Sequence, residues 1–188
     1  MCGYAVVQTH ENCDRLNSCR KAWFLLRDVV MHIRHPQQED YRRIISVVND
    51  WWGGRSMAEM LPKLFFVHFR DTSFIAEVND EIVGFLIGFL SQTYPDEAYV
   101  HFLGVHPNFR KQGVAVRLYE HFFDEVRLRG RRTVRLVTAT VNKESIAFHT
   151  HIGFEIEPQE TKIDGIPFYQ NYDGPGNDRV LFVKQLSS

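Results

Sequence analysis

The spacing of apolar residues along this chain predicts one short strand, then two helices, then a run of strands. Residues 32–34 form the first strand. Pro36 opens a helix, because its fixed backbone angle suits the first helical turn, and the apolar stripe of this helix is Ile44, Ile45, Val47 and Val48. Ser56 and Glu59 have the spacing of a capping box, which predicts the start of a second helix there.

The later segments are predicted from alternation, β-branched runs and turn residues. Strands are expected at residues 74–78, 82–91, 97–105, 133–139, 154–157 and 179–186, and helices at 114–129 and 143–151. Gly153 stands where a helix C-terminal cap is expected. This β-α-α-β-β-β-α-β-α-β-β order fits no simple doubly wound sheet. It predicts an α/β (α+β) protein with a mixed sheet of about six to seven strands, flanked by about four helices.

The segment from Arg110 to Ala115 lies between the strand at 97–105 and the helix that begins at 114. The first N–H groups of a helix have no intrahelical partner, and the helix dipole places partial positive charge there. Gly113 lets a ligand approach the backbone, and Arg110 and Lys111 add full charges. The segment is therefore predicted to bind a phosphate or pyrophosphate. It is neither a Walker loop nor a G-x-G-x-x-G dinucleotide loop.

Two motifs in this region resemble those of the GNAT family of acyl-CoA N-acyltransferases. Arg110-Lys111-Gln112-Gly113-Val114-Ala115 matches the family's pyrophosphate loop, R/Q-x-x-G-x-G/A. About thirty residues later, the segment 142–154 is similar to the family's second signature, N-x-x-A-x-x-x-Y-x-x-x-G-F, with small differences in spacing. The resemblance covers roughly residues 31–186 and implies the GNAT fold and acetyl-CoA as co-substrate.

Composition excludes several other classes of function. The net charge of −1 gives no reason to expect binding to nucleic acid or to a membrane surface. The longest apolar run, residues 82–90, is too short to span a bilayer. Cys2, Cys13 and Cys19 form no zinc or disulfide pattern, so no metal is expected and a reducing cytoplasm is the expected compartment.

The family-like start at Met31 divides the chain into two parts. Residues 1–30 are expected to be an N-terminal extension, and residues 31–188 the acetyltransferase domain. The sequence leaves a homodimer open as an oligomeric state.

The resemblance implies roles for further residues around the loop. The backbone of Leu103, Gly104 and Val105 is expected to pair with the pantetheine arm, and the Val105 N–H to stabilise the oxyanion. Asn142 matches an asparagine that orients the cofactor, and helix capping is an equal alternative for it.

Acetyl transfer also needs a proton for the leaving thiolate and a base for the amine. His149 stands where relatives carry a tyrosine that acts as the acid, and Tyr119 is the alternative donor. Glu97 corresponds to the catalytic glutamate of certain histone-acetylating relatives, and a solvated carboxylate at the strand end, beside Asp96, is the favoured alternative. Alternation is expected to place Glu97, Tyr99, His101 and Leu103 on one face of the strand.

The acceptor amine is expected to meet Trp51, Trp52, Arg55 and His101. Tryptophan rings can face a cationic amine, and an arginine can bind a carboxylate or phosphate. A tryptophan in the core, a surface arginine and a core histidine are the structural alternatives. The long segment 165–177 adds Tyr169, Tyr172 and Asp173 as weaker candidates.

The sequence therefore predicts an N-acetyltransferase that moves an acetyl group from acetyl-CoA to a primary amine of a small molecule. Acetylation of protein N-termini or lysine side chains is the alternative within the enzyme class. A catalytically silent acyl-CoA-binding or regulatory module is the alternative outside it, because His149 replaces the family's tyrosine.

Overall fold

The computed structural model describes residues 30–187, and its centre is a seven-stranded mixed sheet in the order β1-β2-β3-β4-β5-β9-β6. Strands β4 and β5 run parallel, and the other neighbours run antiparallel. The strands are β1 (His32–Arg34), β2 (Phe74–Val78), β3 (Glu81–Leu90), β4 (Glu97–Val105), β5 (Thr133–Ala139), β6 (Glu155–Ile156) and β9 (Arg179–Gln185). The predicted class, an α/β protein with a mixed sheet of about six to seven strands, is confirmed.

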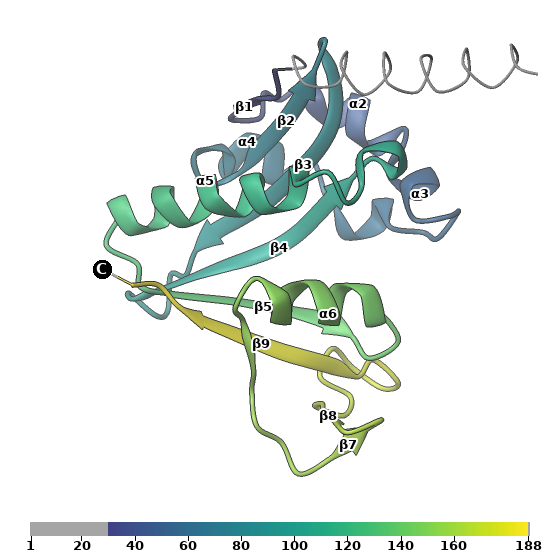
Figure 1. Cartoon of the computed structure of the whole chain (residues 1–188), viewed down its shortest axis with the longest axis vertical. Coiled ribbons are helices and arrows are strands. Elements are labelled where there is room, and N and C mark those ends of the chain that lie inside the picture. Colours follow the sequence, from purple (N-terminus) through teal and green to yellow (C-terminus); the bar gives the residue numbers. More distant parts are fainter. Residues whose placement is uncertain (1–29, 188) are drawn as a thin grey trace, which may run out of the picture.

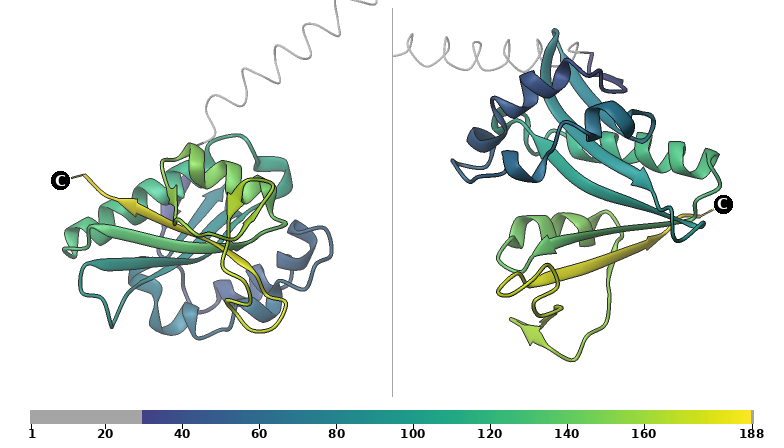
Figure 2. Two further views of the ribbon diagram at one scale, coloured as in Figure 1. Left: turned by 90° about the horizontal axis from the view of Figure 1, so that it is seen from below. Right: turned by 180° about the vertical axis from the view of Figure 1, so that it is seen from behind.

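Helices cover both faces of the sheet (Figures 1 and 2). Three short helices lie on one face: α2 (Asp40–Ile45), α3 (Val48–Trp51) and α4 (Phe65–His68). Two longer helices lie on the other: α5 (Val114–Leu128) and α6 (Lys143–His151). The described residues thus contain five α-helices, three of them short, where about four were predicted.

Each face of the sheet has its own apolar core. The α5 side contains Leu86, Val100, Leu118, Phe122 and Phe182, among others. The opposite side contains Ile44, Trp51, Phe66, Phe85 and Phe102. Both sets are buried, so the sheet is held between two layers of helix.

The predicted boundaries of β4, β5 and α6 are confirmed residue by residue, and Gly153 follows α6 with a left-handed φ of +85°. The capping box at Ser56 is wrong. The segment forms only a 3-10 helix at Ala58–Met60 (η1), and its own N-cap residue, Met57, makes no capping hydrogen bond. The Asn49 Oδ1 atom accepts the N–H groups of Met57 and Ala58 at 2.8 and 2.9 Å, so a residue from α3 supplies the cap.

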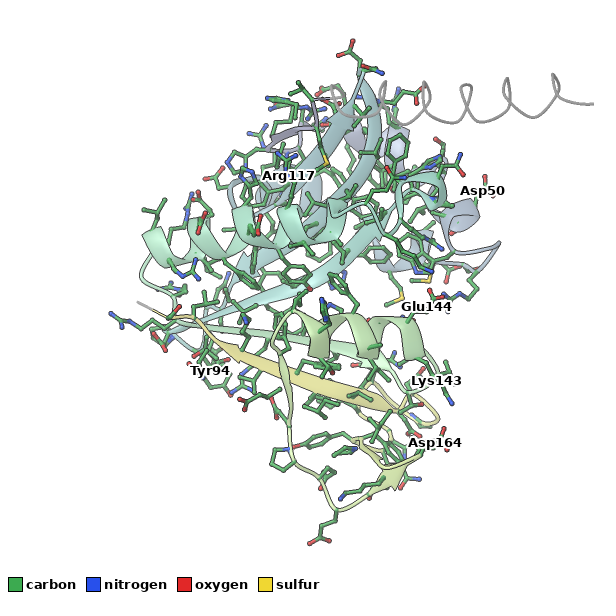
Figure 3. All side chains as sticks on the ribbon, in the orientation of Figure 1. Asp50, Tyr94, Arg117, Lys143, Glu144 and Asp164 are labelled. Atoms are coloured by element: carbon green, nitrogen blue, oxygen red, sulfur yellow. The ribbon has the colours of Figure 1, made fainter. Side chains whose placement is uncertain are left out.

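The long segment before β9 is not free of secondary structure. Strands β7 (Lys162–Ile163) and β8 (Ile166–Pro167) form a small hairpin. Lys143 Nζ lies 2.9 Å from Asp164 Oδ2, which ties the start of α6 to this hairpin (Figure 3).

A β-bulge interrupts the pairing of β3 with β4. Ile87 faces Phe102 and Gly88 faces Val100, so His101 is the extra residue. The bulge changes which side chains share a face. Tyr99 stacks on Phe89 away from α5, whereas Leu103 packs against the core on the α5 side. The prediction that Leu103 shares a face with Tyr99 and His101 is therefore wrong.

The sheet opens between β4 and β5 (Figure 1). Their pairing begins at Glu97–Thr133 and ends at Tyr99–Arg135, whereas β5 continues to pair with β9 along its whole length. The His106 N–H donates to the Val83 carbonyl on β3. In an antiparallel ladder this directs the N–H of Val105 away from β3, towards the opening.

The close packing of β3 on α5 can be tested at Gly88. A Cβ atom there would lie within 3.1 Å of three ring carbons of Phe122, which is fully buried. We expect Gly88→Ala to lower the free energy of unfolding by about 1–3 kcal/mol through overpacking. Urea denaturation measures this change, and adding Phe122→Leu should restore part of the loss. An unchanged midpoint for Gly88→Ala alone would contradict the packing.

Candidate active site

The basic loop after β4 is built by three tight backbone turns. The 3-10 helix Pro107–Phe109 leads into it, and Lys111 and Gly113 both have left-handed φ angles, +60° and +82°. Gly113 is the N-cap of α5. A Cβ atom at Gly113 would meet nothing within 4 Å, so a ligand can approach the backbone there.

The start of α5 offers unpaired N–H groups. Arg117 donates its N–H to the Gly113 carbonyl at 3.1 Å, which is the first bond of the helix. The N–H groups of Val114, Ala115 and Val116 therefore have no carbonyl one turn earlier within the helix. Together with the helix dipole, they provide the anion-binding end that the sequence predicts.

The polar side chains of the loop have different roles. Arg110 turns away from the helix start, since its guanidinium donates to the Trp51 carbonyl and, at 3.4 Å, to the Val105 carbonyl. Gln112 donates to the Asn108 carbonyl at 2.7 Å. Lys111 is exposed and adds a positive charge to the loop, three residues before the first free N–H group.

Asn142 caps the second helix beside the opening. Its Oδ1 accepts the Ser145 N–H at 3.4 Å, and its Nδ2 donates to Thr138 Oγ1 at 3.3 Å. These bonds fix the start of α6 against the end of β5.

The two acid candidates, His149 and Tyr119, meet each other. The Tyr119 hydroxyl lies 2.8 Å from His149 Nε2, and both side chains are buried between α5 and α6. His149 Nδ1 lies 2.7 Å from the Ser145 carbonyl. A carbonyl only accepts, so Nδ1 carries the ring proton, and Nε2 accepts the hydroxyl proton of Tyr119.

The protonation states of this pair follow from its burial. Burial lowers the pKa of His149 to about 4, against the opposing hydrogen bond to the Ser145 carbonyl. Burial likewise raises the pKa of Tyr119 well above its usual value. At neutral pH both groups are uncharged, and the hydroxyl of Tyr119 carries the proton that lies between them.

Glu97, the candidate base, lies in an ion-pair cluster. Its Oε1 accepts Arg135 Nε at 2.8 Å, and the same guanidinium binds Glu157. Its side chain is 19% exposed. The carboxylate is therefore occupied by a fixed cation at the closed end of the sheet.

His101, the bulge residue, lies on the side of α4. Its ring stacks on Phe65 with centroids 4.4 Å apart, and its Nε2 lies 2.7 Å from the Met60 carbonyl. Burial lowers the pKa of His101, and the hydrogen bond to Met60 opposes the shift.

The two neighbouring tryptophans, Trp51 and Trp52, have different environments. Trp51 is 5% exposed and packs near Phe85, so it is a core residue. Trp52 is partly exposed, and its ring lies edge-on to Phe102 beside Gly104. Arg55 is exposed, and its Nε donates to the Trp52 carbonyl at 3.3 Å.

The structure adds one residue that was not singled out from the sequence, Tyr99. It ends the β4–β5 pairing, and burial is the main reason that its pKa is raised to about 12. Tyr172, Asp173 and Arg179 are close enough to influence that pKa, so the segment before β9 folds back towards β4. Alternation along β4 predicted only that Tyr99 shares a face with its neighbours two residues away; its position at the end of the pairing had no sequence signal.

Among residues 30–187, no helix is long and apolar enough to cross a membrane. In that same part of the chain, no cluster of three or more His, Cys, Asp or Glu side chains could hold a metal ion. The three cysteines lie outside the described residues, as does nearly all of the predicted extension at 1–30.

Comparison with known proteins identifies the architecture. Residues 32–154 match the model of the acetyltransferase (GNAT) family. Ard1 from Thermoplasma volcanium superposes with a TM-score of 0.68 at 22% identity, covering 85% of this chain and 100% of Ard1. A diaminobutyrate acetyltransferase from Paenibacillus lautus, in complex with L-2,4-diaminobutyric acid and coenzyme A, gives 0.63 at 21% identity, covering 84% and 95%.

Sequence relatives have acceptors of different kinds. An uncharacterized N-acetyltransferase of Methanocaldococcus jannaschii is 35% identical over 90 residues, 46% of this chain and 40% of that protein. The L-2,4-diaminobutyric acid acetyltransferase of Nocardia farcinica is 28% identical over 130 residues, 69% and 67% of the two chains. The ribosomal protein bS18-alanine N-acetyltransferase of Escherichia coli is 32% identical over 85 residues, 45% and 55%. The first and third matches span about half or less of those relatives.

The His149–Tyr119 bond can be tested by a double-mutant cycle. His149→Phe leaves the buried Tyr119 hydroxyl without an acceptor, so we expect the free energy of unfolding to fall by roughly 1–3 kcal/mol. Adding Tyr119→Phe removes the second polar group and should recover part of the loss. Strictly additive effects in urea denaturation would show that the two groups do not interact.

The same pair predicts a pH dependence of stability. The folded pKa of His149, about 4, lies below the ordinary value of about 6.5, so the unfolded chain takes up the proton first. The contribution of neutral His149 is complete above about pH 6.5 and declines as the pH falls towards 4. We expect wild type to lose more stability than His149→Phe over this range, and parallel curves would contradict the burial of a neutral ring.

Proposed function

Because this chain belongs to the acetyltransferase (GNAT) family, we propose that it transfers the acetyl group of acetyl-CoA to the primary amine of a small molecule in the cytoplasm. The proposal is based on the position of the basic loop. The free N–H groups at the start of α5 directly follow the strand edge that β5 leaves unpaired. One site can thus hold a pyrophosphate and an extended amide-containing arm.

The loop binds the pyrophosphate mainly through its backbone. Val114, Ala115 and Val116 present N–H groups, and Lys111 adds a charge that can turn towards the ligand. The Arg110 guanidinium has a different task, because it holds the carbonyls of Trp51 and Val105. It shapes the loop, and its own N–H donates to the Pro107 carbonyl.

The open edge of β4 supports the thioester arm. Leu103 and Val105 provide backbone groups that can pair with the amides of pantetheine, as an added strand would, whereas the backbone groups of Gly104 between them point towards β3. Val105 donates its N–H towards the opening, and Leu103, two residues earlier, points the same way. These are the donors that would stabilise the negative oxygen formed when the amine attacks the thioester carbon.

The proton for the leaving thiolate comes from the pair on α5 and α6. His149 has a pKa of about 4 and is neutral at physiological pH, so it cannot donate as an imidazolium. Tyr119 carries a hydroxyl proton, which can rotate from His149 Nε2 towards a sulfur atom in the opening. In this proposal Tyr119 is the donor, and His149 orients it.

The acceptor lies on the side of α3 and α4. Trp52 is the partly exposed aromatic residue beside Gly104, and Arg55, held at the Trp52 carbonyl, can bind a carboxylate of the acceptor. The diaminobutyrate acetyltransferase relative supports a small amine that also carries a carboxylate. The bS18-alanine N-acetyltransferase relative supports the alternative, a protein N-terminus.

A panel of amines with acetyl-CoA, followed by thiol release, tests the function. It should contain diamino acids, simple diamines and short peptides with free N-termini. Turnover of a small amine supports the proposal, whereas turnover of peptides alone favours the alternative. Acetyl-CoA binding without turnover of any amine would contradict an enzymatic role for this site.

Binding of CoA at the loop can be tested with Gly113→Glu. The new side chain places a negative charge at the cradle, so we expect a large loss of CoA affinity by calorimetry. Gly130→Glu is the matched control. Gly130 follows α5 at its other end, has a left-handed φ of +75° and has equally open surroundings. Equal CoA affinity for both variants would exclude the loop as the binding site.

Alanine substitutions of the two tryptophans should have different effects, one on acceptor binding and the other on stability. We expect Trp52→Ala to raise the KM for the acceptor while CoA affinity is kept, because the side chain borders the acceptor side. Trp51→Ala should instead destabilise the fold by roughly 3–5 kcal/mol, as large core truncations do. Steady-state kinetics and thermal unfolding measure the two effects, and an unchanged acceptor KM for Trp52→Ala would remove it from the site.

A further inference from the structure

We propose that His101 Nδ1 accepts the proton that the acceptor ammonium must lose before it attacks the thioester. This inference rests on the proposed transfer to an amine and assigns the base within it. His101 is the residue that the β-bulge inserts into β4, two positions beyond Tyr99, where β4 and β5 separate.

The hydrogen bond to Met60 fixes the tautomer of the ring. His101 Nε2 lies 2.7 Å from the Met60 carbonyl, and a carbonyl cannot donate, so Nε2 carries the proton. Nδ1 therefore has its lone pair available. Stacking on Phe65, with centroids 4.4 Å apart, holds the plane of the ring.

The charge state suits a base. Burial lowers the pKa of His101, so the ring is neutral at physiological pH. The titratable groups on the neighbouring elements are Glu59 on η1, His68 on α4 and Tyr99 and Glu97 on β4. The shift is caused by burial, with the Met60 bond opposing it, and by no charged side chain.

The position along the strand matches the direction of the thioester arm. An arm that enters from the start of α5 runs along β4 from Val105 to Leu103, so its acyl end points towards His101. At about 3.3 Å per residue, and with the bulge shortening the rise, His101 lies at most roughly 7 Å beyond Leu103, within reach of an amine or one bridging water.

The rival bases near the opening are engaged or have unsuitable pKa values. Glu97 lies four residues further from the loop and is paired with Arg135 at 2.8 Å. The pKa of Tyr99 is raised to about 12, chiefly by burial, so its hydroxyl keeps its proton. His149 accepts from Tyr119 and donates to Ser145 in the core.

The proposed transfer releases one proton overall. The ammonium gives one proton to Nδ1, and the neutral amine forms a C–N bond with the acetyl carbon. The C–S bond then breaks, and the thiolate takes up the hydroxyl proton of Tyr119. The new amide nitrogen loses its second proton, which replaces the proton that Tyr119 gave away. The imidazolium of His101 then releases its proton to solvent.

His101→Gln is the informative variant. The Gln side chain can still donate to the Met60 carbonyl, but its amide oxygen is a very weak base. On the amine that wild type acetylates best in the panel, we expect kcat/KM to fall by roughly 10²–10⁴-fold with unchanged CoA affinity. The wild-type loss of kcat/KM at acid pH, with its midpoint below the ordinary histidine value of about 6.5, should also disappear.

Controls separate this role from a structural one. Hydroxylamine, which is neutral near pH 7.5, needs no base, so the defect of His101→Gln should shrink with it as nucleophile. In Glu97→Gln, the loss of kcat/KM at acid pH should persist. Wild-type kcat/KM for His101→Gln, or a defect equally large with hydroxylamine, would overturn the assignment.

Two readouts keep the tests distinct. Turnover by wild type reports on the proposed function, and the ratio of variant to wild type reports on His101. Nitrogen NMR of the full chain with ¹⁵N-labelled histidine reports the tautomer without any acceptor. We expect the Nε2–H form for His101, and an Nδ1–H form would overturn the proposal even if an amine is acetylated.

Discussion

The loss of pairing between β4 and β5 after Tyr99 is the constraint on which the rest of the site depends. Backbone N–H and C=O groups in a sheet need partners, and an opening inside a sheet leaves a row of them free. In this protein the opening lies between α5 and α6, with the free helix start at its end. A ligand with an anionic head and an amide-containing arm satisfies both sets of groups at once.

The bulge at His101 has a second consequence, because it reverses the faces of the residues after it. Leu103 turns into the core under α5, and Phe102 and Gly104 turn to the side of Trp52. Because of the bulge, the open edge of β4 has an apolar face packed under α5 and an aromatic face on the side of Trp52. It also places a neutral histidine on the aromatic side, near the end of the pairing.

Several charged groups of the site stabilise its frame and do not face a ligand. Arg110 joins the last residue of α3 to the end of β4, and Arg135 joins Glu97 to Glu157. These bonds connect segments far apart in the chain and set the two sides of the opening. The polar pair of Tyr119 and His149 does the same between α5 and α6, at the cost of burying two groups that must satisfy each other.

The sequence by itself determined the features that depend on neighbouring residues. The glycine and basic residues of 110–115, the limits of β4, β5 and α6, and the cap at Gly153 all follow from local backbone preferences and side-chain periodicity. The family motifs added the fold, since they record a spacing between a strand and two helices.

Only the tertiary structure decided which partners the candidate residues have. His149 meets Tyr119 across 30 positions, His101 meets Met60 across 41, and Arg110 meets Trp51 across 59. The bulge that turns Leu103 away from Tyr99 depends on the register with β3. Such contacts arise from packing between distant segments, and packing has no period along the chain, so residue spacing cannot reveal whether a carboxylate is free or paired.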